Sequence, residues 1–159
     1  MNRKILLTLL SFIIFTSTVY AIGFQIFDMR NKIFEEAKEI KSFLPKSRDG
    51  ILLTAMFDSC IIATTQLDAY FSMLGVFESI NKKDLTDVPV DFVTGWLNEI
   101  KKTNDLNLRI LSSVGQPLDS NTKVHIKKLQ ALFNELNIRI MLELDKFSTI
   151  RESLKIRKR

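Results

Sequence analysis

Four segments of this chain place apolar residues three or four positions apart, and only short breaks separate these segments. Such spacing brings the apolar side chains of a segment onto one face of an α-helix. The segments run from about residue 24 to 44, 50 to 81, 87 to 114 and 119 to 156. Long helices joined by short connections lie antiparallel to their neighbours. The sequence therefore predicts an all-α fold, an up-down-up-down four-helix bundle.

Prolines, a glycine and polar residues mark the breaks between the segments. Pro45 follows the first segment and stops its helix. Ser47 and Asp49 are both candidate caps for the second helix. Pro89 fits the first turn of the third helix, where its missing N–H costs no hydrogen bond. The Gly-Gln-Pro sequence at residues 115–117 ends that helix.

The apolar stripes of the four segments predict the core of the bundle. In the third stripe a polar residue, Asn104, interrupts the apolar positions, and it marks either a polar core position or a local kink. We expect the core to contain Ile26, Met29, Ile33, Ala37, Ile40, Leu44, Leu52, Met56, Cys60, Ala63, Leu67, Tyr70, Leu74, Val93, Trp96, Leu97, Ile100, Leu108, Leu111, Val114, Leu129, Leu132, Phe133, Leu136, Ile140, Leu144, Phe147 and Ile150.

The second segment is apolar over more of its circumference than one neighbouring helix would cover. Asp58, Asp68 and Glu78 recur every ten residues, and each would cost about 2.5–3.5 kcal/mol at the centre of a bilayer. We therefore expect a central core helix rather than a membrane span. Its surplus apolar surface indicates three packed neighbours, a partner protein or a second copy of the chain. Its polar stripe comprises Thr54, Asp58, Ile61, Thr65, Asp68, Ser72, Gly75 and Ser79.

Residues 1–21 have the order of parts of a secretory signal peptide. A basic start precedes an apolar core over residues 5–15, and Val19 and Ala21 supply the small side chains that signal peptidase requires. We expect cleavage after Ala21. The sequence thus predicts an exported protein, either periplasmic or secreted.

An uncleaved leader is the alternative. The stretch over residues 5–27 carries no charge and is long enough to span a hydrocarbon core of about 30 Å. It would then anchor the protein to the membrane. In either case residues 22–156 form the bundle domain, and residues 157–159 form a basic tail.

Few residues of this chain suit catalysis or metal binding. His125 is the single histidine and Cys60 the single cysteine. These are too few for a zinc site built from several His and Cys ligands, and no nucleophile motif surrounds His125. The sequence also lacks a glycine-rich phosphate-binding loop. We therefore expect no enzymatic activity, no catalytic residue, no metal and no cofactor.

Acidic residues of the first segment have a simpler interpretation than catalysis. Glu35, Glu36 and Glu39 fit the solvated face of the first helix, where nearby lysines pair with them.

Met56 and His125 form one low-ranking cofactor hypothesis. Both are expected about one and a half turns into helices that start at the same end of the bundle, so that they could hold haem b between them. The favoured interpretation is that Met56 fills the core, because methionine is a common gap filler, and that His125 is a half-exposed residue near the start of its helix. Other small apolar ligands, such as a lipid or a quinone between the helices, are a related alternative to a well-packed core.

The C-terminal segment is basic. From Asp119 to the end of the chain there are ten Lys and Arg residues against five acidic ones, whereas the stretch from Asp49 to Asn81 has four acidic residues and no basic one. Part of this asymmetry orders the helices by attraction between them. A solvated tail is the favoured interpretation of the last residues. Contact with an anionic membrane surface or an acidic partner is the functional alternative, through Arg151, Lys155, Arg157, Lys158 and Arg159. Nucleic acid is not an expected partner.

Taken together, these patterns favour a protein that acts by binding another protein. We expect an exported, non-enzymatic helical bundle of the adaptor, accessory or inhibitor type in the cell envelope, with a protein partner or a second copy as its target. A carrier of a small apolar ligand and a secreted, cytokine-like helical ligand are the alternatives.

Overall fold

The computed structural model describes residues 26–81, 85–117 and 119–157. Over these ranges the backbone forms long α-helices and one short 3-10 helix, without a strand. The first helix is described over residues 26–43. It is followed by η1 (Leu44–Lys46), α2 (Gly50–Ser79), α3 (Asp87–Ser113) and α4 (Ser120–Arg157). The predicted all-α fold is confirmed. The predicted leader, residues 1–21, lies outside the described residues.

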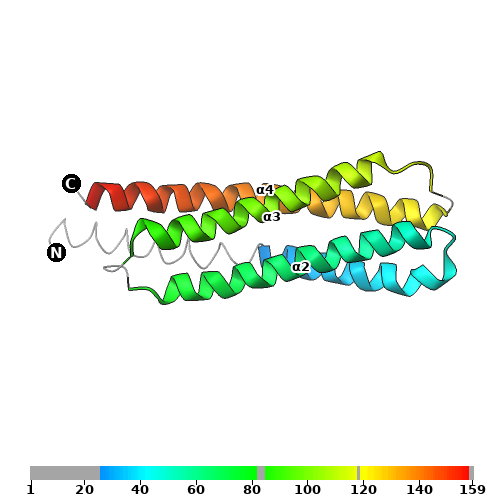
Figure 1. The fold of residues 1–159 in the computed structure, drawn as a ribbon, viewed down its shortest axis with the longest axis horizontal. Coiled ribbons are helices and arrows are strands. Elements are labelled where there is room, and N and C mark those ends of the chain that lie inside the picture. Colours follow the sequence, from blue (N-terminus) through cyan, green and yellow to red (C-terminus); the bar gives the residue numbers. More distant parts are fainter. Residues whose placement is uncertain (1–25, 82–84, 118, 158–159) are drawn as a thin grey trace, which may run out of the picture.

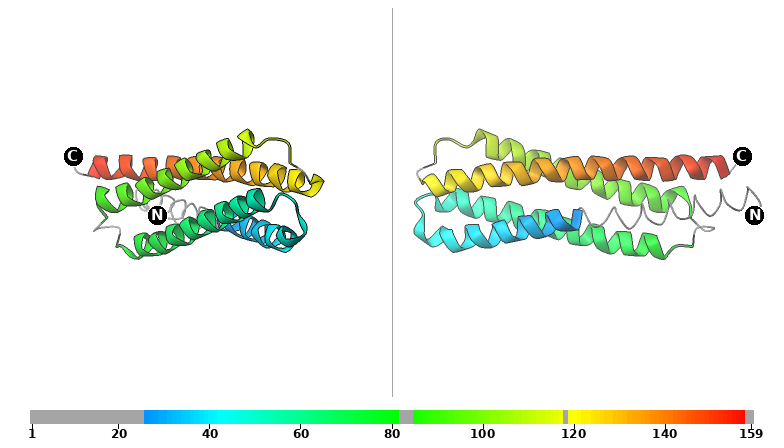
Figure 2. Two further views of the ribbon diagram at one scale, coloured as in Figure 1. Left: turned by 45° about the vertical axis from the view of Figure 1, so that its right-hand side comes forward. Right: turned by 180° about the vertical axis from the view of Figure 1, so that it is seen from behind.

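Consecutive helices run in opposite directions, so the predicted up-down-up-down arrangement is also confirmed (Figures 1 and 2). In Figure 1 the first helix lies along α2, and α3 lies along α4. Polar contacts join each helix to the next around the bundle: Arg30 to Asp68, Trp96 to Gln66, Asn104 to Phe133 and Glu36 to His125.

The predicted stripes form the core, with a change of register in α2. Leu53 is fully buried there, whereas Leu52 is only partly buried. Leu53 lies three positions before Met56, so it continues the buried stripe, while Leu52 is rotated about 100° away from it. Three predicted core residues of α3 and its end, Trp96, Leu108 and Val114, pack at the edge of the core, as do Leu44, Leu132 and Leu144.

Asn104 is a polar core position and not a kink. It is 2% exposed, and α3 continues through it without interruption. Its side-chain amide donates to the backbone oxygen of Phe133 at 2.7 Å and to Asn137 Oδ1 at 2.8 Å. Asn104 therefore joins α3 to α4 by hydrogen bonds inside the core.

Two loops meet at one end of the bundle, the right-hand end in Figure 1. Asp49 occupies the N-cap position of α2, but its side chain makes no capping hydrogen bond. Asp49 Oδ2 instead accepts from Asp119 N at 2.9 Å. In return, Asp119 Oδ2 accepts from Ser47 Oγ and from Arg48 N. We call Ser47, Arg48, Asp49 and Asp119 the loop clamp. Of the two candidate caps, Asp49 is therefore the N-cap residue, but its carboxylate accepts from the other loop instead of from α2.

Among the described helices, α2 is the one whose length and apolar composition would allow a membrane span. Core helices of water-soluble bundles have the same properties, so this is weak support for a span. The predicted polar stripe lies on the outer surface of α2, where Asp58, Asp68 and Glu78 are exposed.

Candidate functional site

An apolar groove lies between the end of α2 and the start of α3. Its volume is about 150 Å³. Phe77 and Val93 are buried at its base, while Val76 and Phe92 are 66% and 65% exposed. We call it the α2–α3 groove; it is lined by Met73, Val76, Phe77, Ile80, Pro89, Phe92 and Val93. All of these side chains are apolar, so the groove can bind an apolar group but offers it no side-chain hydrogen bond.

The groove follows from the register of the two helices. In α2 the buried stripe ends with Leu74 and Phe77, and Met73 and Val76 each lie one position before these residues. They are therefore rotated about 100° away from the core stripe and border α3. On α3, Phe92 stands one position before buried Val93 in the same way. Each helix thus presents a second row of apolar side chains that the bundle covers only in part.

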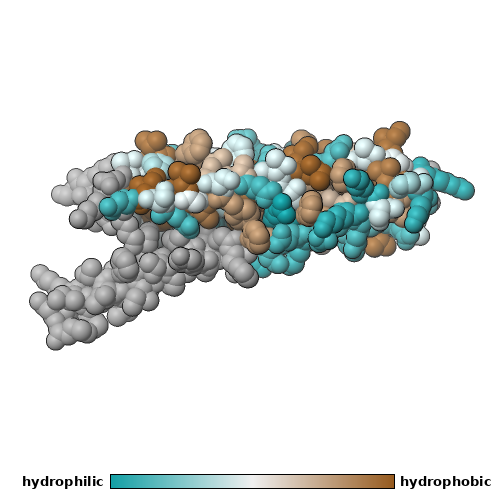
Figure 3. All heavy atoms as spheres, turned by 90° about the horizontal axis from the view of Figure 1, so that it is seen from below, coloured by the Kyte–Doolittle hydropathy of each residue, from teal (hydrophilic) through white to brown (hydrophobic). Residues whose placement is uncertain are grey.

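Exposed apolar residues occur on these two helices and on α4. Among the described residues, twelve large apolar side chains are exposed, and seven of them come from α2 and α3: Ile51, Ile62, Val76, Val88, Phe92, Leu106 and Ile110. Figure 3 shows a face on which hydrophobic patches lie between hydrophilic ones. The surplus apolar surface predicted for α2 is therefore present in the folded bundle.

The outer surface of α2 carries acidic charge only. Between Asp49 and Asn81 there is no Lys, Arg or His. Asp68 is neutralised by Arg30 of the first helix, with both carboxylate oxygens accepting at 2.9 and 2.8 Å. Glu78 is also exposed, but it lies two positions after Val76 and is therefore rotated about 200° around α2, away from the groove.

A second feature is a polar cluster between the first helix and α4. His125 Nδ1 lies 2.6 Å from Glu36 Oε1. Lys128 Nζ lies 3.3 Å from Glu36 Oε2 and 2.7 Å from Glu39 Oε2. We call Glu36, Glu39, His125 and Lys128 the Glu–His cluster. The hydrogen bond from Lys128 lowers the pKa of Glu39, and its bond to Glu39 raises the pKa of Lys128.

The cluster corrects one prediction about the first helix. Glu36 is only 5% exposed and His125 only 9%, so Glu36 does not belong to the solvated face. Glu35 does belong to that face, where it pairs with Lys38 at 2.7 Å. Glu36 lies one position before buried Ala37, at the edge of the core stripe, where α4 covers it.

Aromatic and sulfur-containing neighbours enclose the buried side of the cluster. The Phe43 ring lies 5.8 Å from the His125 ring, centroid to centroid. Burial, together with the charge of Glu36, raises the pKa of the Cys60 thiol to about 12. The thiol therefore stays protonated and does not act as a nucleophile.

An open groove reaches the cluster from solvent. It has a volume of about 500 Å³ and is lined by Asn31, Lys32, Glu35, Glu36, Glu39, Lys128, Ala131 and Leu132. Both glutamates of the cluster line this groove, which makes the buried carboxylate of Glu36 accessible. Ala131 is the small side chain that leaves room between the first helix and α4.

Met56 and His125, the residues of the haem hypothesis, are both buried. The expectation that His125 is half-exposed was wrong, because Glu36 and Phe43 pack against its ring. Met56 is 2% exposed and belongs to the apolar core. The described contacts of His125 are with Glu36 and Phe43. Haem binding by this pair gains no support from these contacts and stays a prediction.

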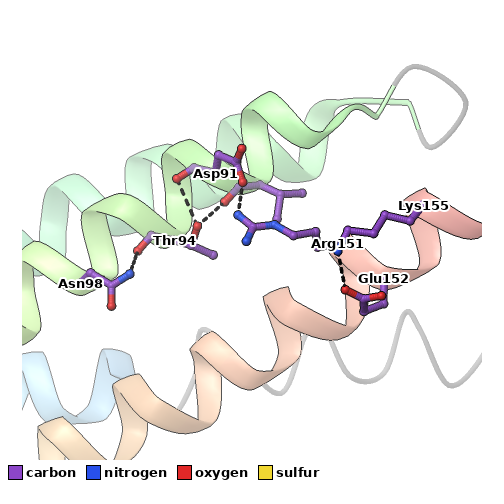
Figure 4. Close-up of polar contacts among 7 residues, drawn as sticks. Asp91, Thr94, Asn98, Arg151, Glu152 and Lys155 are labelled. Carbon is purple, nitrogen blue, oxygen red and sulfur yellow. Dashed lines mark hydrogen bonds and ion pairs between the residues drawn. The ribbon is translucent and has the colours of Figure 1, made fainter.

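Two cations of the basic C-terminal segment have acidic partners within the protein (Figure 4). Arg151 pairs with Asp91 of α3, and Lys155 Nζ lies 2.7 Å from Glu152 Oε1. Arg157 is the last residue of α4, and Lys158 and Arg159 lie outside the described residues. Contact of this segment with a membrane or an acidic partner stays a prediction.

Sequence reasoning missed another buried polar pair, Tyr70 and Glu143. The Tyr70 hydroxyl donates to Glu143 Oε1 at 2.5 Å. Burial raises the pKa of Glu143. A signal was available, because Glu143 lies three positions after Ile140 and four before Phe147, which places it on the core stripe of α4.

In comparisons with protein-family models, with curated proteins and with solved structures, no match to this chain was found. The function is therefore inferred from the α2–α3 groove and the Glu–His cluster themselves.

Proposed function

We propose that this protein is an exported, non-enzymatic helical bundle that binds another protein in the cell envelope through its α2–α3 groove. The observation that carries the proposal is the uncovered apolar lining, in which Val76 and Phe92 are 66% and 65% exposed. Contiguous apolar surface of this kind is typical of protein interaction sites. Burying it against a partner would contribute about 25 cal/mol for each Å² removed from water.

The size of the groove favours a side chain as its occupant. A cavity of about 150 Å³ holds one benzene-sized group, such as a Leu or Phe side chain. Pockets that bury small-molecule ligands usually measure about 300–1,000 Å³. The groove therefore suits a side-chain anchor of a partner better than a lipid or a quinone, the ligands of the alternative carrier function.

The charge of α2 indicates which residues of the partner flank its anchor side chain. The exposed face of α2 carries acidic residues and no basic ones. A partner helix with apolar residues on one face and Lys or Arg at its border matches this surface in both respects. We therefore propose an amphipathic, basic helix of another protein as the partner.

A second copy of the chain fits this face less well. Two-fold pairing through α2 would place the same surface of both copies in contact. Asp58 and Glu78 of one copy would then approach acidic residues of the other, and like charges across an interface repel. The charge of α2 thus favours a different protein over self-association.

Export is part of the proposal and rests on the leader-like order of residues 1–21. N-terminal sequencing of the protein isolated from its native envelope tests it. An N-terminus at Ile22 is expected for the cleaved form, whereas an intact Met1 in the membrane fraction would indicate the anchored form. Recovery of the whole protein from the cytosol would contradict export in both forms.

A synthetic helix tests the binding surface directly. The probe is an idealised peptide with Leu at helical spacing and Lys on its other face; a matched peptide carries Glu in place of Lys. We expect the Leu/Lys peptide to bind and to perturb the NMR methyl signals of Met73, Val76 and Ile80. The Leu/Glu peptide should bind at least tenfold more weakly, because the acidic residues on the outer surface of α2 repel it.

Matched variants make this test specific. Phe92→Gln should weaken binding of the Leu/Lys peptide at least tenfold. Ile138→Gln serves as the control, since Ile138 is 61% exposed on α4. If Phe92→Gln and Ile138→Gln bind the peptide with the same affinity, or if wild type does not bind it, the groove is not the interaction site. Sedimentation of the protein alone identifies the competing outcome, self-association.

A further inference from the structure

We propose that Glu36, Glu39 and His125 form a binding site for a divalent transition-metal ion such as Zn²⁺, and that Lys128 competes with the ion for this site. The inference is independent of the α2–α3 groove. It concerns a different pair of helices, the first helix and α4.

The three side chains supply suitable donor atoms close together. One imidazole nitrogen and two carboxylate oxygens all lie within 4.8 Å of one another. Zinc binds imidazole nitrogen and carboxylate oxygen at about 2.0–2.2 Å, so donors around a tetrahedral ion lie about 3.3 Å apart. The 2.6 Å between His125 Nδ1 and Glu36 Oε1 would widen when an ion enters between them, and rotation of the Glu39 side chain would bring its carboxylate closer.

The fold holds two of the donors and leaves the third adjustable. Glu36 and His125 are 5% and 9% exposed, so packing restricts their rotation. Glu39 lies three positions after Glu36, on the same face of the first helix, and its side chain is 56% exposed. Glu39 can therefore move toward an ion held by the other two residues.

The groove beside the cluster gives an ion access to the buried carboxylate. Both Glu36 and Glu39 line this open groove of about 500 Å³. It also has room for water molecules at the remaining coordination positions. Three protein ligands with an open position are the usual arrangement of accessible zinc sites.

Charge favours a dication over the present lysine. Among the described residues, Lys128 is the one cation that contacts both carboxylates, at 2.7 Å from Glu39 and 3.3 Å from Glu36. One ammonium group balances one of these two negative charges, whereas a dication balances both. Because the Lys128 side chain is 47% exposed, it can turn into solvent when an ion binds.

An unused polar group supports the assignment. Thr122 is fully buried, and among the described residues its hydroxyl has no hydrogen-bond partner. It stands three positions before His125, on the same face of α4. The interior beside the cluster therefore contains more hydrogen-bonding capacity than protein contacts use.

The sequence predicted no zinc site, because one histidine and one cysteine are too few for a site built from those ligands. Carboxylates are also zinc ligands, but acidic residues are common on helix surfaces. Only the fold reveals that two of them lie beside the single histidine.

Metal titration of the protein as isolated, without a histidine tag, tests the proposal. We expect calorimetry to show one Zn²⁺ ion bound per chain, and Co²⁺ to produce visible absorption bands of a protein-bound ion. Lys128→Met should bind Zn²⁺ at least tenfold more tightly, because the competing ammonium group is gone. Glu39→Gln should bind at least tenfold more weakly.

The control is Glu35→Gln, which removes the same charge from an exposed neighbour on the first helix. Its affinity should change by less than threefold. His125→Ala and Glu36→Gln should abolish binding, with circular dichroism to show that they fold. Since Glu39 is exposed, Glu39→Gln gives the test without altering the core. Equal affinities of Glu39→Gln and Glu35→Gln, or no binding by wild type and Lys128→Met, would overturn the proposal.

Discussion

The Tyr70 hydroxyl of α2 donates a 2.5 Å hydrogen bond to Glu143 Oε1 of α4 inside the core. Tyr70 is 0% exposed and Glu143 is 2% exposed. Burial raises the pKa of Glu143, while the hydrogen bond from Tyr70 acts in the opposite direction. Burial and the neighbouring Glu143 charge also raise the pKa of the Tyr70 phenol, which therefore remains a donor. The stability of the bundle thus depends on a polar pair within its apolar interior.

Removal of the Tyr70 hydroxyl should destabilise the protein. Tyr70→Phe leaves the Glu143 carboxyl buried without this partner, so we expect the free energy of unfolding to fall by about 1–3 kcal/mol. Urea denaturation measures this change. In a Glu143→Met background the same substitution should cost much less. An equal loss in both backgrounds would show that Tyr70 and Glu143 are not coupled.

Glu143 should make stability depend on pH in a defined direction. Because its pKa is raised in the folded state, its contribution is fully present below the pKa of an unfolded glutamate and is lost as pH rises through the folded value. Glu143→Gln should remove this dependence. The measurement is the difference in unfolding free energy between wild type and Glu143→Gln from pH 4 to pH 8, and the wild-type advantage should decrease with rising pH. Hydrogen bonds from Lys128 and Lys101 lower the pKa values of Glu39 and Asp105, so these groups give stability the opposite dependence on pH. Because both proteins contain them, their contributions cancel when the two unfolding free energies are subtracted.

The hydrogen bonds of Asn104 should be worth more than those of an exposed asparagine. Asn104→Ala removes the donor to Phe133 O and Asn137 Oδ1 within the core, and we expect a loss of about 1–3 kcal/mol. Asn98 is the matched control, because its amide donates to Thr94 O at 2.9 Å on the surface of the same helix (Figure 4). Asn98→Ala should change stability by about 0.5 kcal/mol or less. Thermal unfolding of both variants decides whether burial is the cause of the difference.

The loop clamp should protect its two loops from proteolysis. Asp119→Ala removes the acceptor for Ser47 Oγ and Arg48 N, and we expect cleavage after Lys46 or Arg48 by trypsin to become several times faster. The exposed residue Asp58 provides a control substitution, Asp58→Ala, that should leave the cleavage rate unchanged. Equal rates for wild type and Asp119→Ala would mean that the clamp does not restrain these loops.

Helical periodicity predicted most of the fold. The breaks at Pro45 and at residues 115–117 lie where helices end, and Asp87 begins α3 as expected. Apolar periodicity locates the buried face of a helix only to within about one residue. For this reason the sequence predicted Leu52 as a core residue, whereas Leu53 is the one that is buried. Such a shift moves a side chain by about 100°, enough to leave the core.

The polar residues of the core were harder to predict. Glu36 lies at the edge of an apolar stripe and Glu143 on one, but an acidic residue usually indicates solvent. Each of these glutamates is buried because a residue of another helix forms a hydrogen bond with it. The partner of Glu36 is His125, and the partner of Glu143 is Tyr70. Sequence spacing within one helix carries no information about such a partner. The α2–α3 groove was anticipated as surplus apolar surface on α2, although its position at the end of that helix depends on where α3 packs.

The loop clamp fastens one end of the rod, and the α2–α3 groove lies at the opposite end (Figure 1). Partner binding at the groove would stabilise the end of the bundle that the clamp does not reach, because a ligand that binds only the folded state raises its stability. Association and rigidity would then rise together.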